Sequence, residues 1–279
     1  MITNFLTIDI EEWFHPTLIK PYITEDLRKY HRIVNNTSRI LELLSRFNTK
    51  ATFFILGEVA EQVPGLVKEI YKGGHEIATH GYGHNLVFSQ SPNEFRLDLQ
   101  GSISLLEDIT GEKIKGCRVP TWSITEKSLW ALEIIKESGL SYDSSISPAI
   151  FNLAKYYDCT LKKGFFLLKK DSLIEFPQTT IKLLGKNISF GGGFFLRLYP
   201  YFFTKSVIEN MNKNGVPAMV YLHPWELDCD AVQPTVPFKN RFISYANTRS
   251  LTSKLKFLLS DFKFIKLSTF IEQQINDGK

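Results

Sequence analysis

Two histidines stand four residues apart in the segment HGYGHN, residues 80–85. His80 follows the strand-like segment HEIAT, and His84 lies beyond two glycines, whose flexible backbone allows the chain to bend close to an ion. Imidazole nitrogens are common zinc ligands, and a carboxylate would complete a site with open positions for water. That arrangement is typical of a catalytic metal rather than a structural one.

The candidate carboxylates lie at the end of the first apolar segment, NFLTIDIEEW, where Asp9, Glu11 and Glu12 stand close together. Three acids after a strand are often a solvated turn, but a neighbouring arginine would keep one of them ionised. Residues two apart share one face of a strand, so Asp9 and Glu11 are expected on one side and Glu12 on the other. Glu11 is the better candidate for the third ligand, although a bulge could turn Glu12 inward.

Further ionisable residues follow other strand-like segments: Arg118 ends KGCRV, Asp143 lies in LSYDSS and His223 ends PAMVYLH. A carboxylate bonded to an imidazole raises the pKa of the ring and fixes its orientation, as a general acid near neutral pH requires. We therefore expect Asp143 to pair with His223; the alternative for Asp143 is a turn cap within DSS. Arg118 is expected to pair with one of the three acids after the first strand.

Two tryptophans stand beside these positions. Trp122 comes shortly after Arg118, and Trp225 shortly after His223. Both could be ordinary core residues, but aromatic faces at the same rim would also suit the binding of sugar rings.

The elements that must position these residues alternate along the first half of the chain. NFLTIDI, KATFFIL, HEIAT and KGCRV have the β-branched and aromatic character of strands. The segments between them carry apolar residues at helical spacing; EVAEQVPGLVKEIYKGG predicts one helix closed by glycines, and Ser-Pro at 91–92 opens a long one. Repeated strand–helix units predict a parallel sheet covered by helices, with the strand ends meeting at one rim where ligands bind.

The second half departs from this rhythm between residues 150 and 200, where aromatic runs and a triple glycine predict a β-rich or irregular insertion. After it, PAMVYLH predicts a buried strand and KFIKL a final one. No internal repeat or linker interrupts the chain, so a single catalytic domain over residues 1–279 is the simplest expectation.

Composition limits the function. A chain of 279 residues with 43% hydrophobic content can bury a large core, and a net charge of +4 without a dense Lys/Arg block argues against nucleic-acid binding. Three widely spaced cysteines predict reduced thiols. The first residues lack the pattern of a signal peptide, and no run approaches the length of a transmembrane helix. We therefore expect a cytoplasmic protein, which could act near the inner membrane face.

Five segments together resemble one family: ATFFILG, GHEIATHGYGH, RVPTWSIT, SYDSSI and YLHPWELD. They are similar to the polysaccharide deacetylases, the carbohydrate esterase family 4 group with the NodB homology domain, and within it to the branch associated with bacterial exopolysaccharide loci. The resemblance extends over about residues 5–270. It implies a distorted (β/α) barrel of about seven strands, one divalent metal and hydrolysis of an N-acetyl group.

The resemblance also implies a role for each matching position. His80 and His84 would bind the metal, Asp9 would be the catalytic base, and Arg118 would be the partner of that base. His223 would be the catalytic acid, Asp143 would tune that acid, and Leu222 would lie beside the acetyl methyl pocket. One position departs from the family. Its first motif, T-F-D-D-G, has a metal-binding aspartate directly after the base, where this chain has Ile10. Glu11 or Glu12 must then supply the third ligand, or the histidines and water hold the metal alone.

These residues predict a metal-dependent hydrolase that removes N-acetyl groups from an amino sugar in a bacterial poly- or oligosaccharide or its precursor. The metal is expected to be zinc, with cobalt or nickel able to replace it. The partner is then an N-acetylated carbohydrate, bound in part by Trp122 and Trp225. Three alternatives remain: another C–N hydrolase, acting on a formamido sugar or a cyclic amide; an inactive carbohydrate-binding protein; and a structural or storage metal site.

Overall fold

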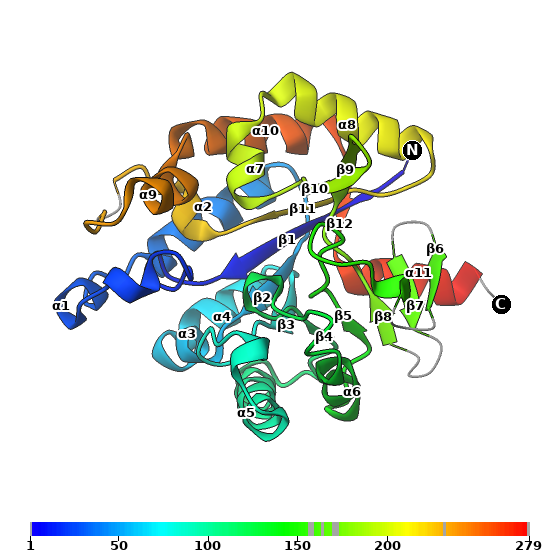
Figure 1. The fold of residues 1–279 in the computed structure, drawn as a ribbon. Helices are drawn as coiled ribbons and strands as arrows, with labels where there is room; N and C mark the ends of the chain where they lie inside the picture. The colour runs from blue at the N-terminus through cyan, green and yellow to red at the C-terminus, as the bar shows by residue number, and fades with distance from the viewer. Residues whose placement is uncertain (1, 156–158, 163–164, 169–172, 231–232, 278–279) are drawn as a thin grey trace.

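The computed structural model describes residues 2–155, 159–162, 165–168, 173–230 and 233–277. At its centre is a curled sheet with helices on its outer side (Figure 1). Within the described chain, seven parallel strands follow the order β11-β1-β2-β3-β4-β5-β8, and β12 pairs in parallel with the start of β1. Their bounds are β1 Asn4–Ile10, β2 Thr52–Ile55, β3 Glu76–Thr79, β4 Gly116–Cys117, β5 Tyr142–Asp143, β8 Leu173–Glu175, β11 Met219–Leu222 and β12 Phe264–Ile265. The predicted distorted barrel of about seven strands is confirmed.

Strand β1 pairs with three other strands, β11, β2 and β12. All seven of its residues are buried, as expected of a parallel strand that is covered on both faces. Leu6 and Ile8 pack outward into the large core between sheet and helices, whereas Phe5 packs with Phe54 inside the barrel. Because side chains alternate along a strand, Asp9 lies on the same inner face as Phe5.

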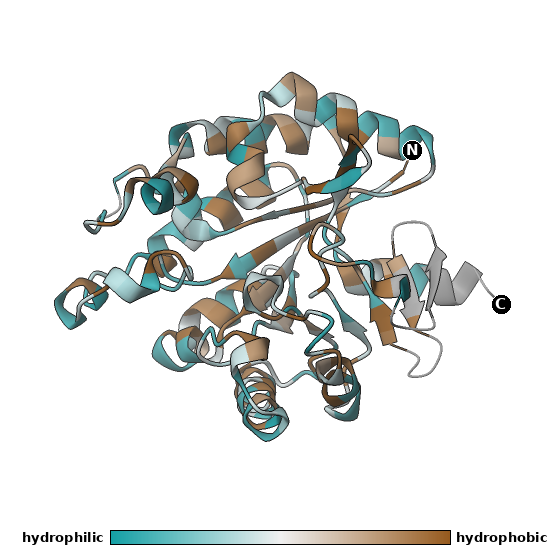
Figure 2. Cartoon of the chain, viewed as in Figure 1, coloured by the Kyte–Doolittle hydropathy of each residue, from teal (hydrophilic) through white to brown (hydrophobic). Residues whose placement is uncertain are grey.

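The helices cover the outer face and carry hydrophobic and hydrophilic residues side by side, as amphipathic helices do (Figure 2). In Figure 1, α5 and α6 lie on one side of the sheet, and α8 and α10 lie on the other. The helix bounds are α1 Glu25–Arg28, α2 Ile33–Arg46, α3 Gly57–Gln62, α4 Pro64–Lys72, α5 Pro92–Thr110, α6 Trp130–Glu137, α7 Gly193–Leu198, α8 Tyr201–Lys213, α9 Phe238–Tyr245, α10 Leu251–Asp261 and α11 Leu267–Asp277. None in the described chain is long and apolar enough to cross a bilayer.

The long predicted helix that Ser91 and Pro92 open is confirmed as α5. Ser91 and Glu94 form a reciprocal capping box, in which the Ser91 hydroxyl accepts from the Glu94 N–H and the Glu94 carboxylate accepts from the Ser91 N–H. The helix ends at Gly111, whose φ of 74° is the left-handed conformation that glycine adopts without strain.

The single helix predicted for residues 58–74 is wrong, because the structure has two, α3 and α4. Pro64 has no backbone N–H and disfavours helical geometry at the residue before it. Val63 accordingly leaves the helical region, with φ −135° and ψ 61°, and Pro64 begins α4.

The segment from 150 to 200 is β-rich, as predicted, in the part that the structure describes; residues 156–158, 163–164 and 169–172 lie outside it. Strands β6 Cys159–Lys162 and β7 Phe165–Leu168 extend the sheet in antiparallel fashion beyond β8. Strands β9 Thr180–Leu183 and β10 Lys186–Ser189 form a separate hairpin. The segment is not wholly an insertion, however, because β8 pairs in parallel with β5 and is part of the barrel.

The chain passes Tyr142 very closely at Gly116, so an alanine there should destabilise the fold. A Cβ on Gly116 would lie 1.9 Å from the Tyr142 ring, which is fully buried. We expect Gly116→Ala to lower the free energy of unfolding by about 1–3 kcal/mol or more, the usual effect of overpacking. Gly65→Ala is the control, because no heavy atom lies within 4 Å of the new methyl. Urea unfolding of both variants measures the difference; equal stabilities would contradict the packing at Gly116.

Candidate active site

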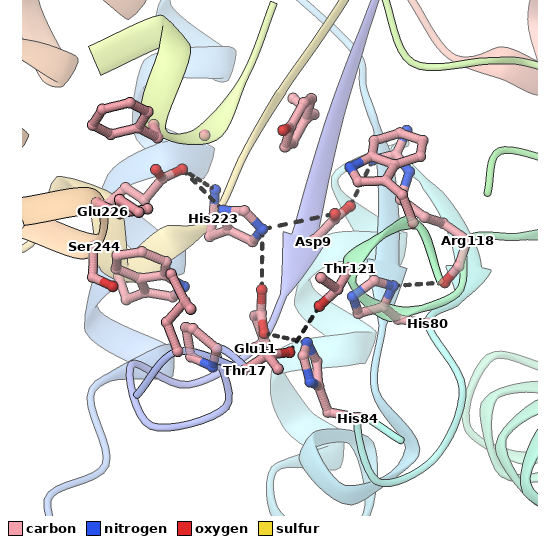
Figure 3. A pocket seen from close by; sticks show the side chains of 18 of the residues that line it. Asp9, Glu11, Thr17, His80, His84, Arg118, Thr121, His223, Glu226 and Ser244 are labelled. Atoms are coloured by element: carbon pink, nitrogen blue, oxygen red, sulfur yellow. Dashed lines mark hydrogen bonds and ion pairs between the residues drawn. The ribbon is translucent and has the colours of Figure 1, made fainter. Parts of the chain in front are cut away.

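The carboxyl ends of β1, β3, β4 and β11 open into one pocket of about 210 Å³ (Figure 3). The predicted rim therefore exists, since residues that follow four different strands line the same cavity. The chemically active side chains that line it are Asp9, Glu11, His80, His84, Arg118, Trp122, Tyr221, His223, Trp225 and Glu226.

Glu11, His80 and His84 form a buried cluster whose nitrogen and oxygen ligand atoms all lie within 4.8 Å of one another. The Nδ1–H of His80 donates to the Arg118 carbonyl at 2.6 Å, which leaves Nε2 of that ring for an ion. Glu11 Oε2 lies 2.9 Å from His84 Nε2, so the carboxylate and this imidazole nitrogen face each other in the buried cluster. A carboxylate oxygen and imidazole nitrogens gathered in this way fit the ligands of a cation.

The charges of this cluster also suit a divalent metal. Burial by itself would raise the pKa of Glu11, but His84 and His223 outweigh it and hold that pKa well below its ordinary value. Burial lowers the pKa of His80 to about 4, although Asp9 and Glu11 oppose it. Near neutral pH the cluster therefore offers an ionised carboxylate and a neutral imidazole, the protonation states that metal ligands need. The identity of the metal stays a prediction.

Glu12 faces away from the cluster. Its carboxylate accepts hydrogen bonds from the backbone N–H groups of Arg32 at 2.9 Å and Ile33 at 3.1 Å, at the start of α2. A carboxylate is favourable there because the unpaired N–H groups of a helix start carry partial positive charge. The chain turns directly after β1, where the Glu11 N–H donates to the Asp9 carbonyl at 3.1 Å. Of the two predicted alternatives, only Glu11 is placed beside the histidines.

Asp9 and Arg118 form the predicted pair. Arg118 NH1 lies 2.7 Å from Asp9 Oδ1, and both side chains are at most 5% exposed. The guanidinium also donates to the Thr7 hydroxyl and the Ser144 carbonyl, and it lies 4.2 Å from the centre of the Phe54 ring. Removing one partner of such a buried pair typically costs about 3–5 kcal/mol, because the other charge is left uncompensated.

His223 is oriented by Glu226. Its Nδ1 and its backbone N–H both donate to Glu226 Oε2 at 3.0 Å, and its Nε2 points to Glu11 Oε1 at 3.0 Å and Asp9 Oδ2 at 3.9 Å. Arg197 in turn donates to Glu226 Oε1 at 2.7 Å. Burial would raise the pKa of Glu226, but Arg197 and His223 lower it to about 2. Burial would lower the pKa of His223, but Glu11 and Glu226 raise it to about 9.

The predicted pair of Asp143 and His223 is wrong. It assumed that their strands are neighbours, whereas β1, β2, β3 and β4 lie between β11 and β5 in the sheet. Asp143 instead accepts hydrogen bonds from the Ser145 hydroxyl and N–H, and it faces Glu175. Burial raises the pKa of both acids, so one carboxyl of this pair is held protonated.

The rim aromatics lie as predicted, but Leu222 does not. Trp122 and Trp225 both line the pocket, and the Trp225 ring is stacked on His223 with centroids 5.5 Å apart. Leu222, expected beside the acetyl methyl, is fully buried in the large core behind the sheet. Because side chains alternate along β11, the residue of that strand that lines the pocket is Tyr221.

The sequence alone did not predict a role for two residues of this site, Glu226 and Arg197. A signal for Glu226 exists, because in HPWE it stands three residues after His223, the spacing of a capping box. No local signal marks Arg197, which lies in the aromatic segment FFLRLYP and reaches Glu226 only through the fold.

Comparison with known proteins gives a family for the first half of the chain. Residues 22–142 match the family model of the polysaccharide deacetylases, and residues 144–272 match a domain of unknown function, DUF3473. A peptidoglycan-N-acetylglucosamine deacetylase of Bacillus cereus is 39% identical over 128 residues, which is 42% of this chain. The match spans 46% of that relative's length.

Solved structures share the fold at low sequence identity. A protein of Mycobacterium smegmatis described as a polysaccharide deacetylase has a TM-score of 0.63 at 19% identity, over 96% of this chain and 88% of its own. Puue allantoinase has a TM-score of 0.60 at 16% identity, over 95% of this chain and 87% of its own. At these identities the likeness shows the fold alone.

The adjacent acids Glu11 and Glu12 provide a matched test of the metal site. Glu11→Gln removes a charged ligand, so we expect it to weaken zinc binding by more than about 100-fold. Loss of a residue that only supports a ligand typically weakens metal binding by about 10–100-fold. Glu12→Gln removes the charge at the start of α2, which should cost about 0.3–1 kcal/mol of stability and leave zinc bound. Calorimetric zinc titration measures the zinc affinity of each variant, and urea unfolding measures its stability. Loss of zinc from the Glu12 variant alone would contradict the assignment.

Proposed function

We propose that this chain, which contains a polysaccharide deacetylase domain of carbohydrate esterase family 4, is a metal-dependent hydrolase of C–N bonds that removes N-acetyl groups from an amino sugar. The observation that carries the proposal is the convergence, in one pocket, of Asp9, the Glu11–His80–His84 cluster and a protonated His223. Hydrolysis of an amide needs these three parts: a base for water, an electrophile for the carbonyl and an acid for the leaving amine.

Glu11, His80 and His84 would hold the ion. A bound divalent metal would supply Lewis acidity, which lowers the pKa of water and polarises an amide carbonyl. We expect zinc, because a carboxylate with two imidazoles is a usual zinc donor set. Cobalt and nickel would be replacements.

Asp9 is the proposed general base. Its Oδ1 is held by Arg118 at 2.7 Å, while its Oδ2 faces the pocket and lies 3.9 Å from His223 Nε2. The ion pair fixes the rotamer of Asp9 and leaves one oxygen to take a proton from the attacking water.

His223 is the proposed general acid. It must be protonated to give a proton to the leaving amine, and the Glu226 carboxylate, which accepts a hydrogen bond from its Nδ1, raises its pKa. Arg197 keeps Glu226 ionised, so the proton stays on the imidazole. In this chain Glu226 therefore has the tuning role that the family resemblance gave to Asp143.

The loop after Arg118 is suited to stabilise the oxyanion. Thr121 and Trp122 have φ values of 57° and 54°, a left-handed conformation that is strained for residues with side chains. Consecutive N–H groups in such turns can point to one concave spot and bind an anion. Both residues line the pocket, and we propose that their N–H groups stabilise the negative oxygen that would form there.

The proposed substrate is an N-acetylated bacterial poly- or oligosaccharide, or a precursor of an exopolysaccharide made in the cytoplasm. The similarity to a peptidoglycan-N-acetylglucosamine deacetylase supports an amino-sugar substrate. Hydrolysis of a cyclic amide is the second candidate, because the fold is shared with an allantoinase. The products distinguish the two, since only the first reaction releases acetate.

The proposal is tested by measuring acetate released from a panel of N-acetylated sugars, with formate and ring-opened products measured in parallel. We expect acetate release that stops after chelation and returns with zinc. Asp9→Asn should keep zinc and lose about 10²–10⁴ in rate, the usual contribution of a general base. Thermal unfolding of this variant is the control, because Arg118 loses a charged partner. Full turnover by the chelated protein or by Asp9→Asn would refute the mechanism.

Glu226 and Asp143 give a matched test of the acid. An imidazolium acid is active while protonated, so the rate falls as pH rises through its pKa. Glu226→Gln removes a carboxylate that raises this pKa, and the alkaline limb of the pH–rate profile should therefore move to lower pH. Asp143→Asn should leave the limb in place, because Asp143 has other partners. A shift in the Asp143 variant alone would restore Asp143 as the partner of His223.

A further inference from the structure

Two short helices from the second half of the chain, α7 and α9, stand at the mouth of the pocket. Phe194 on α7 and Ile243 on α9 both line it. Beyond the mouth, α9 presents Phe242, 45% exposed, and Phe238, 83% exposed. Single exposed phenylalanines are common on protein surfaces, but two that adjoin a pocket are candidates for contact with its ligand.

The three phenylalanine rings form a continuous row. The rings of Phe194 and Phe242 have centroids 5.7 Å apart at 65°, and those of Phe242 and Phe238 are stacked with centroids 6.3 Å apart at 22°. The row begins at the pocket lining and leads outward along α9. It therefore continues the surface of the pocket instead of forming a separate patch.

Buried cations hold both helices in place. Arg197, 1% exposed, donates to the Ile243 and Ala246 carbonyls at the end of α9 as well as to Glu226. Lys254 donates to the Leu196, Arg197 and Tyr199 carbonyls at the end of α7. The Arg197 guanidinium thus holds both α9, which carries the exposed rings, and the Glu226 carboxylate, which orients His223. Buried contacts therefore fix the distance between the phenylalanine row and His223.

We propose that Phe194, Phe242 and Phe238 form a binding platform for the sugar units that adjoin the reacting unit, and that the substrate is accordingly a chain of linked pyranoses rather than a single sugar. The apolar C–H face of a pyranose packs well on an aromatic ring, and successive rings can hold successive units. This inference rests on the proposed function, because it assumes that the pocket takes the N-acetylated unit.

The polar residues of α9 favour a sugar over a lipid surface. Lys239, Asn240 and Arg241 stand between the two exposed phenylalanines in the sequence. Asn240 donates to the Leu18 carbonyl at 2.9 Å, and Arg241 donates to Gln233 at 3.1 Å. On the helix Phe238 and Phe242 share one face, and these polar residues project from the faces beside it, so the apolar surface of α9 is narrow and edged by polar groups, as suits a carbohydrate. A membrane-binding helix would instead have one wide apolar face.

The test uses N-acetylglucosamine and its β-1,4-linked oligomers, from the monomer to the hexamer, with the zinc-loaded protein. In the unmodified protein we expect kcat/KM to rise with chain length. The double variant Phe238→Ala/Phe242→Ala should lose about tenfold in kcat/KM on the hexamer, mainly through KM, and less than about twofold on the monomer. Phe238→Trp/Phe242→Trp should restore the length dependence. Phe202→Ala on α8 is the control, being 76% exposed and outside the pocket lining.

Calorimetric binding of the hexamer to the chelated protein separates this inference from the proposed function. If affinity rises with oligomer length and the double alanine variant loses this rise, the platform is supported even when no acetate is released. In that case only the proposed function fails. If rate and affinity do not depend on length, or the double variant matches the unmodified protein on every oligomer, the inference is wrong. It is also wrong if the double variant loses binding only to phosphatidylglycerol vesicles, which would make the row a membrane contact.

Discussion

The buried ion pair between Arg118 and Asp9 is the interaction on which the site depends. It joins the end of β4 to the end of β1 inside the barrel, and it holds the Asp9 carboxylate in the lining of the pocket. A charge in such a place is unfavourable unless it is paired and hydrogen-bonded. Arg118 meets that condition with Asp9, Thr7 and Ser144, and its own carbonyl accepts the His80 Nδ1–H. The position of the proposed base and the orientation of one candidate metal ligand thus depend on one residue.

The four acids around the pocket differ in function because they differ in partners. Asp9 faces an arginine, Glu226 bridges Arg197 and His223, and Glu12 binds the start of α2. Glu11 alone among these four belongs to the buried cluster with His80 and His84, where its Oε2 lies 2.9 Å from His84 Nε2. That oxygen lies beside two imidazoles, and a cation is the ligand that satisfies all three groups together.

The two halves of the chain contribute different parts of one site. The first half supplies Asp9, Arg118 and the cluster of Glu11, His80 and His84; the deacetylase family model matches residues 22–142 of it, which include Arg118, His80 and His84. The half that matches the domain of unknown function supplies His223, Glu226 and Arg197, together with the helices at the pocket mouth. Because β11 of the second half pairs with β1 of the first, neither half encloses the pocket without the other.

The sequence by itself determined the parallel sheet and the rim, and its resemblance to a known family implied the barrel. Strand and helix patterns are local, and parallel strand–helix units place strand ends together whatever the details, so His80, His84, Asp9 and His223 could be assigned to one cavity. Only the tertiary structure decided the partners of these residues. The order of the strands in the sheet keeps Asp143 away from His223, and whether Glu11 or Glu12 faces the pocket depends on a turn after β1. Arg197 reaches the site through a contact between distant segments. Such contacts depend on distances across the folded chain, and no local pattern encodes them.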